Sequence, residues 1–401
     1  MSKINDLIRE LCPNGVPYIR INDCCNFQNG FAFKSNLFKD SGDILLRITN
    51  IDGKEINLSD VKYIDKNDYN VNLDNYIVND DEIVIAMSGA TTGKIGINKT
   101  HKILYLNQRV GKITPNTSKL NNHFLYHILL SKTSYFYQLA GGGAQPNLST
   151  DAIKSTLIPL PPLEVQEEIV RILDKFGELE AELEAELEAR KSQYELWRGN
   201  VFSSNDNLVK LDDICNITAG GTPSKTHSEY WEDGNIKWLG STVCENKKGI
   251  SEVTNYITEL GLNKSSAKLL KPGTTLIAMV GATIGKVAYL DYEACTNQNV
   301  AGLYPKNINE LDTSYLYHAC RNLYSTFLDY ANGKFSMASL GYIKNLEIPL
   351  PDISEQRRIA KLLDNFDALV NDISVGLLAE IELRRKQYEY YRNKLLAFEE
   401  N

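Results

Sequence analysis

The chain has 401 residues, of which 43% are hydrophobic and 23% charged, and its formal net charge is −8. At about 150 residues per domain, this length accommodates two or three domains that each bury a core. No stretch approaches the roughly 18 consecutive apolar residues of a membrane span, and the N-terminus lacks the pattern of a signal peptide. The composition therefore excludes a membrane protein and a small disulfide-stabilised scaffold, and we expect a soluble, cytoplasmic protein.

The cysteines and histidines form no metal-binding or disulfide pattern. The seven cysteines include no Cys-x-x-Cys pair, and none lies near clustered histidines. Zinc sites and disulfide frameworks depend on such spacings. We therefore expect no bound metal and a reducing compartment.

The negative charge is concentrated in one segment. Residues 1–162 carry 17 basic and 15 acidic side chains, whereas residues 163–202 carry 5 basic and 11 acidic ones. Residues 203–351 carry 13 and 15, and residues 352–401 carry 8 and 10. A nearly neutral domain can still present a basic face, so the net charge does not exclude a nucleic-acid partner.

In chain order, residues 1–158 are expected to form an α+β domain. Short alternating runs punctuated by Gly, Asn and Asp indicate strands, and aromatic and aliphatic residues at helical spacing predict one helix over residues 122–139. Pro159, Pro161 and Pro162 then introduce a long helix, residues 159–203. A second α+β domain follows at 204–348, with a helix at 313–330, and a second long helix occupies 349–401.

The two halves of the chain are copies of one pattern, at an offset of about 190 residues. Ala86-Met-Ser-Gly-Ala-Thr-Thr-Gly-Lys94 recurs as Ala278-Met-Val-Gly-Ala-Thr-Ile-Gly-Lys286. Five further landmarks recur in the same order, at 107–110 and 297–300, 125–127 and 316–318, 158–161 and 348–351, 173–176 and 363–366, and 193–195 and 387–389. Such a duplication determines the architecture of a fold. The expected order is domain, helix, domain, helix.

Both long helices carry apolar seams that require a partner. At about 1.5 Å per residue, residues 162–202 would span roughly 60 Å and residues 353–397 nearly 70 Å. The seams predict that the two helices pack antiparallel as a coiled coil and hold two pseudo-symmetric domains apart. The residues assigned to this seam or to a partner are Ile169, Ile172, Phe176, Leu179, Leu183, Leu187, Tyr194, Trp197, Ile359, Leu362, Phe366, Leu369, Ile373, Tyr388 and Tyr391.

The repeated Gly-rich motif is not a nucleotide-binding P-loop. Only three residues separate Gly89 from Gly93, and Ile95 stands where a P-loop has its magnesium-binding hydroxyl. A tight hairpin explains the glycines but not the lysine that recurs as Lys94 and Lys286. The motif is suited to contacting phosphates and bases from a sheet edge.

Amide side chains recur at a second pair of matching positions. Asn107-Gln108-Arg109 corresponds to Asn297-Gln298-Asn299, and these side chains can read adenine and guanine edges. Buried structural amides are an equally good interpretation of this pattern. The loops at 141–147 and 333–337 are linkers or binding loops. No catalytic constellation accompanies these segments, and His127 and His318 are interpreted as core or interface residues.

The duplicated order, the Gly-Ala-Thr-x-Gly-Lys turn, the Ile-Pro-Leu-Pro entry and the Gln-Tyr exit of the long helix resemble the specificity subunit of type I restriction–modification systems. The resemblance covers essentially the whole chain. It implies two target-recognition domains, 1–158 and 204–348, that read the halves of a bipartite site in double-stranded DNA. The spacer helices, 159–203 and 349–401, would act as a ruler and carry two methyltransferase subunits.

The same resemblance implies a non-catalytic subunit of an N6-adenine methyltransferase and type I endonuclease complex. Cofactors would be absent from this chain, with S-adenosylmethionine on the methyltransferase, and ATP and Mg on two restriction subunits where those are present. The expected DNA contacts are Lys34, Arg47, Ser88, Thr91, Thr92, Lys94, Asn107, Gln108, Arg109, Gln145, Asn147, Lys225, Lys237, Thr242, Thr283, Lys286, Asn297, Gln298, Asn299, Lys334 and Ser336.

Three copies of Glu-Leu-Glu-Ala occupy residues 178–189. Between Phe176 and Gln193 there are 17 steps, and between the matching Phe366 and Gln387 there are 21, so the first helix is one tetrapeptide shorter. One tetrapeptide adds about 6 Å and roughly 40° of rotation to a helix, and one base pair advances about 3.4 Å and turns about 35°. A fourth copy is therefore expected to lengthen the unread spacer by about one base pair. The alternative interpretation of the three copies is simply a well-formed, solvent-exposed helix.

Two other functions remain open at this point. One is a coiled-coil dimerisation protein without DNA binding. The other is the specificity subunit of a system that methylates DNA but lacks a restriction partner.

Overall fold

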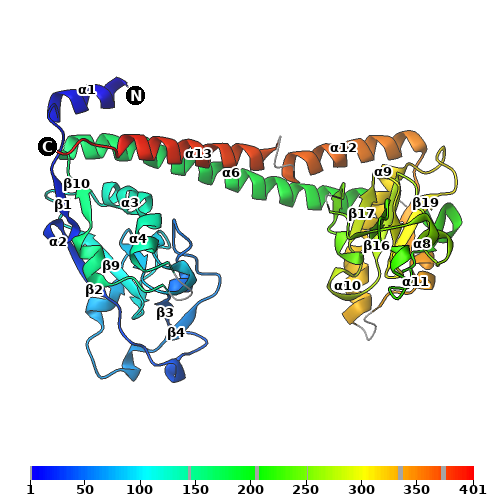
Figure 1. Cartoon of the computed structure of the whole chain (residues 1–401), viewed down its shortest axis with the longest axis horizontal. Helices are drawn as coiled ribbons and strands as arrows, with labels where there is room; N and C mark the ends of the chain where they lie inside the picture. Colours follow the sequence, from blue (N-terminus) through cyan, green and yellow to red (C-terminus); the bar gives the residue numbers. More distant parts are fainter. Residues whose placement is uncertain (1, 143–145, 204–206, 251, 333–336, 372–375) are drawn as a thin grey trace. The chain divides into compact units, whose positions relative to one another are not determined.

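The chain divides into two compact units in the computed structural model, which describes residues 2–142, 146–203, 207–250, 252–332, 337–371 and 376–401 (Figure 1). The first unit comprises residues 1–182 and 382–401, and the second comprises residues 183–381. Each unit mixes helices and sheets, and the long helix α6 (Leu163–Ser203) passes from one unit to the other. The predicted α+β class with two related domains and long spacer helices is confirmed.

The first unit contains a central four-stranded sheet in the order β2-β9-β6-β7 and a second sheet in the order β4-β3-β8-β5. A two-stranded ribbon, β1-β10, completes it. Its elements, in chain order before α6, are α1 (Ser2–Leu11), β1 (Tyr18–Arg20), α2 (Ile21–Cys24), β2 (Cys25–Asn29), β3 (Asp43–Leu46), β4 (Lys62–Ile64), β5 (Ile77–Val78), β6 (Ile83–Ala86), β7 (Ile95–Ile97), β8 (Leu104–Leu106), β9 (Val110–Pro115), α3 (Asn122–Ser131), α4 (Thr133–Leu139), α5 (Thr150–Ser155) and β10 (Leu157–Pro159).

The second unit repeats this plan with sheets β12-β19-β16-β17-β14, β15-β13-β18 and β11-β20. The central pairing keeps its register, because Ala86 pairs with Val110 and Ala278 with Val300. The elements after α6 are β11 (Leu208–Lys210), α7 (Leu211–Ile214), β12 (Cys215–Ala219), β13 (Ile236–Leu239), β14 (Lys247–Lys248), β15 (Asn255–Ile257), α8 (Glu259–Asn263), β16 (Thr274–Ala278), β17 (Val287–Leu290), β18 (Cys295–Thr296), β19 (Val300–Pro305), α9 (Thr313–Asn322), α10 (Tyr324–Asn332), α11 (Leu340–Asn345), β20 (Glu347–Pro349), α12 (Ile353–Asn371) and α13 (Leu377–Leu395).

The central strand β6 is buried on both faces. Successive strand residues point to opposite sides, so Ile83 and Ile85 join the core shared with α3, while Val84 and Ala86 join the core shared with the second sheet. In the second unit Ile277 and Leu276 divide in the same way. A strand with no solvent-facing side is a rigid base for the turn that leaves it. The seven cysteines are buried and unpaired within these cores and elsewhere.

Three helix predictions need correction. The helix expected over 122–139 is split into α3 and α4 at Lys132, and its counterpart is split into α9 and α10 at Leu323. The long helix expected over 353–397 is interrupted, because Gly376 is a bend between α12 and α13. A Cβ at Gly376 would lie 2.4 Å from the carbonyl oxygen of Leu369, so the backbone at this point approaches the last turn of α12 too closely for any other residue.

The spacer helices pack antiparallel within each unit. In the first, the Phe176 and Tyr391 rings stack with centroids 5.4 Å apart, and Arg385 bonds Glu180. In the second, Leu187 packs with Ile381, and Phe366 lies 6.0 Å from the Tyr194 ring. Of the remaining seam residues, Ile169 and Ile359 are buried; Ile172, Leu179, Leu183, Trp197, Leu362 and Tyr388 are partly buried; Leu369 is 39% exposed; and Ile373 lies outside the described residues. Among the described helices, none is long and apolar enough to cross a membrane.

A buried glutamine ties each globular domain to its spacer helix. Gln166, on α6, donates to the carbonyl oxygens of Lys119 at 2.9 Å and Pro161 at 2.7 Å, and accepts from the Asn121 amide at 2.8 Å. Gln356, on α12, makes the same three bonds to Glu310, Pro351 and Asp312 at 2.8, 2.8 and 2.9 Å. Both glutamines are fully buried. These bonds occupy backbone groups that would otherwise be unpaired at the joint.

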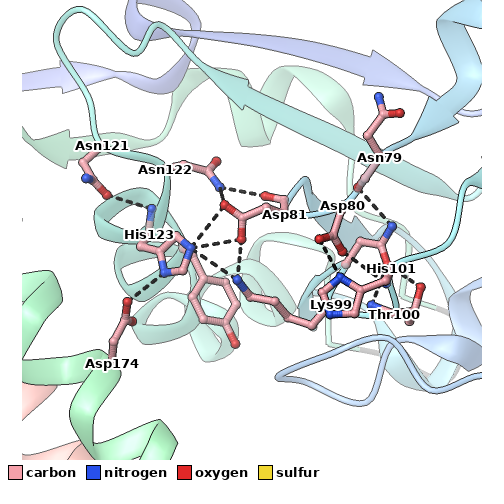
Figure 2. A network of polar contacts seen from close by, with 12 residues as sticks. Asn79, Asp80, Asp81, Lys99, Thr100, His101, Asn121, Asn122, His123 and Asp174 are labelled. Carbon is pink, nitrogen blue, oxygen red and sulfur yellow. Dashed lines mark hydrogen bonds and ion pairs between the residues drawn. The ribbon is translucent and has the colours of Figure 1, made fainter.

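A histidine and aspartate network lies beside the joint in the first unit (Figure 2). His123, on α3, lies between Asp174 of α6, at 2.8 Å from Nδ1, and Asp81, at 3.0 Å from Nε2. The buried His127 contacts the other oxygen of Asp174 at 2.8 Å and the hydroxyl of Tyr388 at 2.9 Å. In the second unit the buried His318 contacts Asp364 at 2.7 Å. The prediction that His127 and His318 are core or interface residues is confirmed.

Replacing Gln166 by leucine should destabilise the protein strongly. The side chain keeps roughly its size but loses three hydrogen bonds and leaves their backbone partners unpaired, which should cost about 3 kcal/mol. The free energy of unfolding, measured in urea, checks this. The matched control is Gln193→Leu at an exposed position of the same helix, where the cost should stay below about 0.5 kcal/mol. Equal losses in the two variants would contradict the assigned role of the joint.

The stabilisation by His123 should weaken as the pH rises. The hydrogen bond to Asp174 raises the pKa of His123, and this outweighs the opposing effect of burial. A raised folded-state pKa stabilises the protein fully below the unfolded pKa of about 6.5, and the gain is lost as the pH rises through the folded value. His123→Gln should therefore destabilise the protein more at about pH 6 than at about pH 8.5.

The measurement is urea unfolding at both pH values. The control is His101→Asn, because His101 pairs with Asp80 at 2.9 Å but its side chain is 83% exposed, and asparagine tolerates its positive φ of 55°. A His123→Gln effect that is the same at both pH values would rule out the charged pair as its source.

Candidate nucleic-acid interface

The Gly-Lys turn, residues 88–94 and 280–286, has the same backbone in both units. The turn leaves β6 through a 3-10 turn, η5 (Gly89–Thr91), and enters β7; its counterpart is η8 (Gly281–Thr283). Gly93 donates to Ala86, at 2.8 Å, and Lys94 to Thr91, at 3.0 Å. Gly285 and Lys286 repeat these bonds at 2.8 and 2.9 Å. The repeated motif therefore specifies one rigid backbone shape.

The second glycine of the turn is required by conformation and by packing. Gly93 has φ 82° and Gly285 has φ 75°, values that residues other than glycine rarely adopt. A Cβ at Gly93 would meet the backbone of α4 at 3.0 Å, and one at Gly285 would lie 2.3 Å from Phe327 of α10. Close packing against this helix positions the turn.

The side chains of the turn divide into buried and available groups. Thr92 is 3% exposed and donates to the carbonyl of Gly89 at 2.7 Å; the matching Ile284 is also buried. This pair shapes the turn, and burial disfavours the expected contact of the Thr92 side chain with DNA. Lys94 and Lys286 are half-buried. Within the described residues, neither ammonium has a hydrogen-bond or ion-pair partner.

Three segments meet at the residue that precedes the turn. In the first unit the Met87 amide donates to the carbonyl of Arg109 at 2.9 Å, and the Met87 carbonyl accepts from Leu148 at 2.8 Å. In the second unit Met279 does the same with Asn299 and Ala338, at 2.9 and 2.8 Å. The Gly-Lys turn, the Asn-Gln segment (107–109 and 297–299) and the return segment (146–148 and 337–338) therefore form one surface in each unit.

Side-chain contacts within this surface differ between the units. In the first unit Arg109 donates from Nη1 to Asn147 Oδ1 at 3.3 Å, and the Thr91 hydroxyl donates to the carbonyl of Ile48 at 3.1 Å. In the second unit Gln298 accepts from the Thr222 hydroxyl at 2.5 Å. Gln108 and Gln298 are both exposed. A common backbone thus presents guanidinium and amide groups in one unit and amides and a hydroxyl in the other.

The structure brings together, in the first unit, Ser88, Thr91, Thr92, Lys94, Asn107, Gln108, Arg109 and Asn147, and in the second, Thr283, Lys286, Asn297, Gln298 and Asn299. Other expected contacts lie outside these three segments, although Arg47 stands between Leu46 and Ile48, whose carbonyls accept from the Asn107 amide and the Thr91 hydroxyl. Arg47 bonds Asp60 at 3.4 Å, and Lys237 lies 3.5 Å above the Tyr292 ring. Lys34, Lys225 and Thr242 are exposed in loops or turns. Gln145, Lys334 and Ser336 lie outside the described residues.

Sequence reasoning missed the segment that follows β2 and β12. A Cβ at Gly30 would lie 2.0 Å from the Asn107 carbonyl oxygen, and one at Gly220 would lie 2.1 Å from that of Thr296. The matching glycines of the two halves signal this close approach, and they lead to Thr222 beside the Asn-Gln segment. Over the described part of the chain there is no group of three or more metal-ligating side chains.

Comparison with known families assigns the chain. The family described as "Type I restriction modification DNA specificity domain" matches residues 13–189 and again 204–383. The chain is 37% identical over 294 residues to the Escherichia coli "Type I restriction enzyme EcoR124I/EcoR124II specificity subunit", covering 69% of this chain and 70% of the relative. It is 32% identical over 299 residues to a putative type I specificity subunit of Haemophilus influenzae, covering 70% and 73%.

Solved structures share the fold. The S subunit of a type I restriction–modification system from M. genitalium aligns with a TM-score of 0.53 at 17% identity, covering 96% of this chain and 97% of that one. A chain from a structure titled for complex assembly and conformational transition of the type I R-M system aligns with a TM-score of 0.62 at 20% identity, covering 96% and 98%. Since two specificity domains account for most of its length, the chain belongs to the family of type I restriction–modification specificity subunits.

Proposed function

We propose that the two units read the two halves of a bipartite site in double-stranded DNA, and that the paired spacer helices dock two methyltransferase subunits. In this division, residues 1–158 and 204–348 are the target-recognition domains, and residues 159–203 and 349–401 are the spacer helices. The chain contributes sequence recognition and geometry and carries out no chemistry itself.

One observation carries this proposal. The same three segments meet in the same way in both units, around Met87 and Met279, but present different side chains. A lysine without a partner among the described residues stands at the matching position of each turn, as expected for a phosphate contact. The amide and guanidinium groups beside it can bond base edges. A duplicated frame with different polar groups suits two different half-sites.

The proposal also covers the remaining partners and cofactors. S-adenosylmethionine belongs to the methyltransferase subunits and the modified base is adenine at N6. Where restriction subunits join, they supply the ATP and Mg chemistry. The side chains proposed to contact DNA are those of the two surfaces. Thr92 would contribute by shaping its turn. We place the complex in the cytoplasm, with no membrane partner.

The test is co-expression of this chain with its methyltransferase subunit in a host that lacks both. Long-read sequencing of the host DNA should show N6-methyladenine at one motif with two defined halves and a constant gap. The methyltransferase expressed alone should leave that motif unmethylated. Equal methylation with and without the chain would contradict the proposal. A chain that binds DNA no better with the methyltransferase than without it would favour the structural alternative. A neighbouring gene for a restriction subunit separates a complete system from one that only methylates.

A fourth Glu-Leu-Glu-Ala copy, inserted after Ala189, should lengthen the unread gap by about one base pair. The added helix contributes roughly 40°, near the twist of about 35° of one base pair, and about 6 Å, which exceeds the rise of one base pair, about 3.4 Å, and falls short of the rise of two. Sequencing of methylated DNA gives the gap directly. The control replaces Glu186 and Glu188 by glutamine, which changes the charge and leaves the length alone. An unchanged gap in the insertion variant would refute the ruler.

A further inference from the structure

The three tetrapeptide copies are identical in sequence but not in environment. All six of their glutamates are described; Glu180 is 4% exposed, and the other five are exposed. Their shared sequence offers no reason for this difference. Glu180 is buried because side chains from two other segments of the first unit, Lys54 and Arg385, bond it.

Both oxygens of Glu180 are occupied. Lys54, in the segment between η2 (Ile48–Asn50) and β4, places its ammonium 2.5 Å from Oε2, and Arg385, on α13, places Nε 2.5 Å from Oε1. Burial would raise the pKa of this carboxyl, but the bonds from Arg385 and Lys54 outweigh it, so the pKa is lowered and the group stays charged. The bridge therefore joins the globular domain to both spacer helices at one point.

Hydrogen bonds hold the backbone around Lys54. Its carbonyl oxygen accepts from the Tyr126 hydroxyl at 2.7 Å and from the amide of Ile97, on β7, at 3.3 Å. The side chain of Asn50 closes the same segment with bonds to the carbonyls of Asn57 and Asp60, at 3.0 and 2.8 Å. Because the Lys54 backbone is bonded to the globular domain and its ammonium to Glu180, this lysine can fix the position of the domain relative to α6.

The same segment reaches the recognition surface. Ile48 accepts the bond from Thr91, and a Cβ at Gly53 would lie 3.8 Å from the side chain of Lys94. Residues 48–54 thus lie against the Gly-Lys turn at Ile48 and Gly53 and bond the spacer helix α6 through Lys54.

We propose that Lys54, Glu180 and Arg385 form a positioning bridge that sets the orientation of the first recognition domain on the spacer helices. The first tetrapeptide copy is then an anchor, and the copies after it supply length. This inference rests on the proposed function, since an orientation matters only if the domain reads DNA at a defined distance from a second site.

The second unit supports the principle with different residues. Lys248, on β14 beside β17, contacts Asp364 of α12 at 2.6 Å and Ser314 at 2.5 Å. A lysine beside the strand that follows the Gly-Lys turn, β7 or β17, thus reaches a spacer-helix carboxylate in each unit. In the second unit that carboxylate, Asp364, lies outside the Glu-Leu-Glu-Ala copies.

Lys54→Met should weaken the discrimination between correct and incorrect gap lengths, and the sequences of the two half-sites should stay the same. Loss of a partly exposed ion pair should raise the ratio of methylation at gaps one base pair too long or too short, relative to the correct gap, by about threefold to fivefold. The full chain is co-expressed with its methyltransferase, and methylation is scored on a plasmid that carries all three gaps. Lys54→Arg should restore the wild-type ratio, because it keeps the charge.

Glu180→Gln should behave like Lys54→Met. Its matched control is Glu178→Gln, in the same copy, where the exposed carboxylate pairs with Lys175. If Glu180→Gln fails to fold, Lys54→Met still decides, because Lys54 is 48% exposed. Unchanged gap ratios in Lys54→Met, or an equal change in Glu178→Gln, would overturn the bridge. A wild-type chain that directs no bipartite methylation would instead overturn the proposed function.

Discussion

The glutamine joint is the contact that fixes each globular domain to its spacer helix. Gln166 on α6 and Gln356 on α12 are buried, and within the described residues they bond only backbone groups of the globular domain and of the proline-rich segment before the helix. An unpaired buried amide is costly, so this joint is either complete or broken. Because it fixes backbone and not side chains, the residues that line the domain surface can change while the domain keeps its place on the helix.

The Gly-Lys turn applies the same division within the recognition surface. Backbone bonds and the two glycines specify its shape, and the buried position can be Thr92 in one unit and Ile284 in the other. Arg109 and Asn299 occupy matching positions with different chemistry, although both backbones bond the methionine before the turn. We infer that DNA specificity can diverge between the halves, because the side chains that would read DNA do not determine the backbone shape of the turn.

Much of this organisation could be predicted from the sequence, because a duplicated pattern compares the chain with itself. The repeated motif and the Asn-Gln segment indicated the two surfaces, since positions retained in both halves carry the frame. The interruption at Gly376 could not be predicted from apolar spacing, which continues on either side of it. The close approach of this glycine to Leu369 depends on three-dimensional packing that periodicity does not encode.

The tetrapeptide copies mark the limit of local sequence reasoning most clearly. Identical residues predict identical roles, yet Glu180 is buried between Lys54 and Arg385, which lie 126 and 205 residues away. Its environment comes from partners and not from its own copy. A repeated segment that gains or loses a copy always leaves an identical glutamate at position 180. Copy number can therefore change while the anchor to the first domain persists, which lets a helix vary in length without releasing the domain at its end.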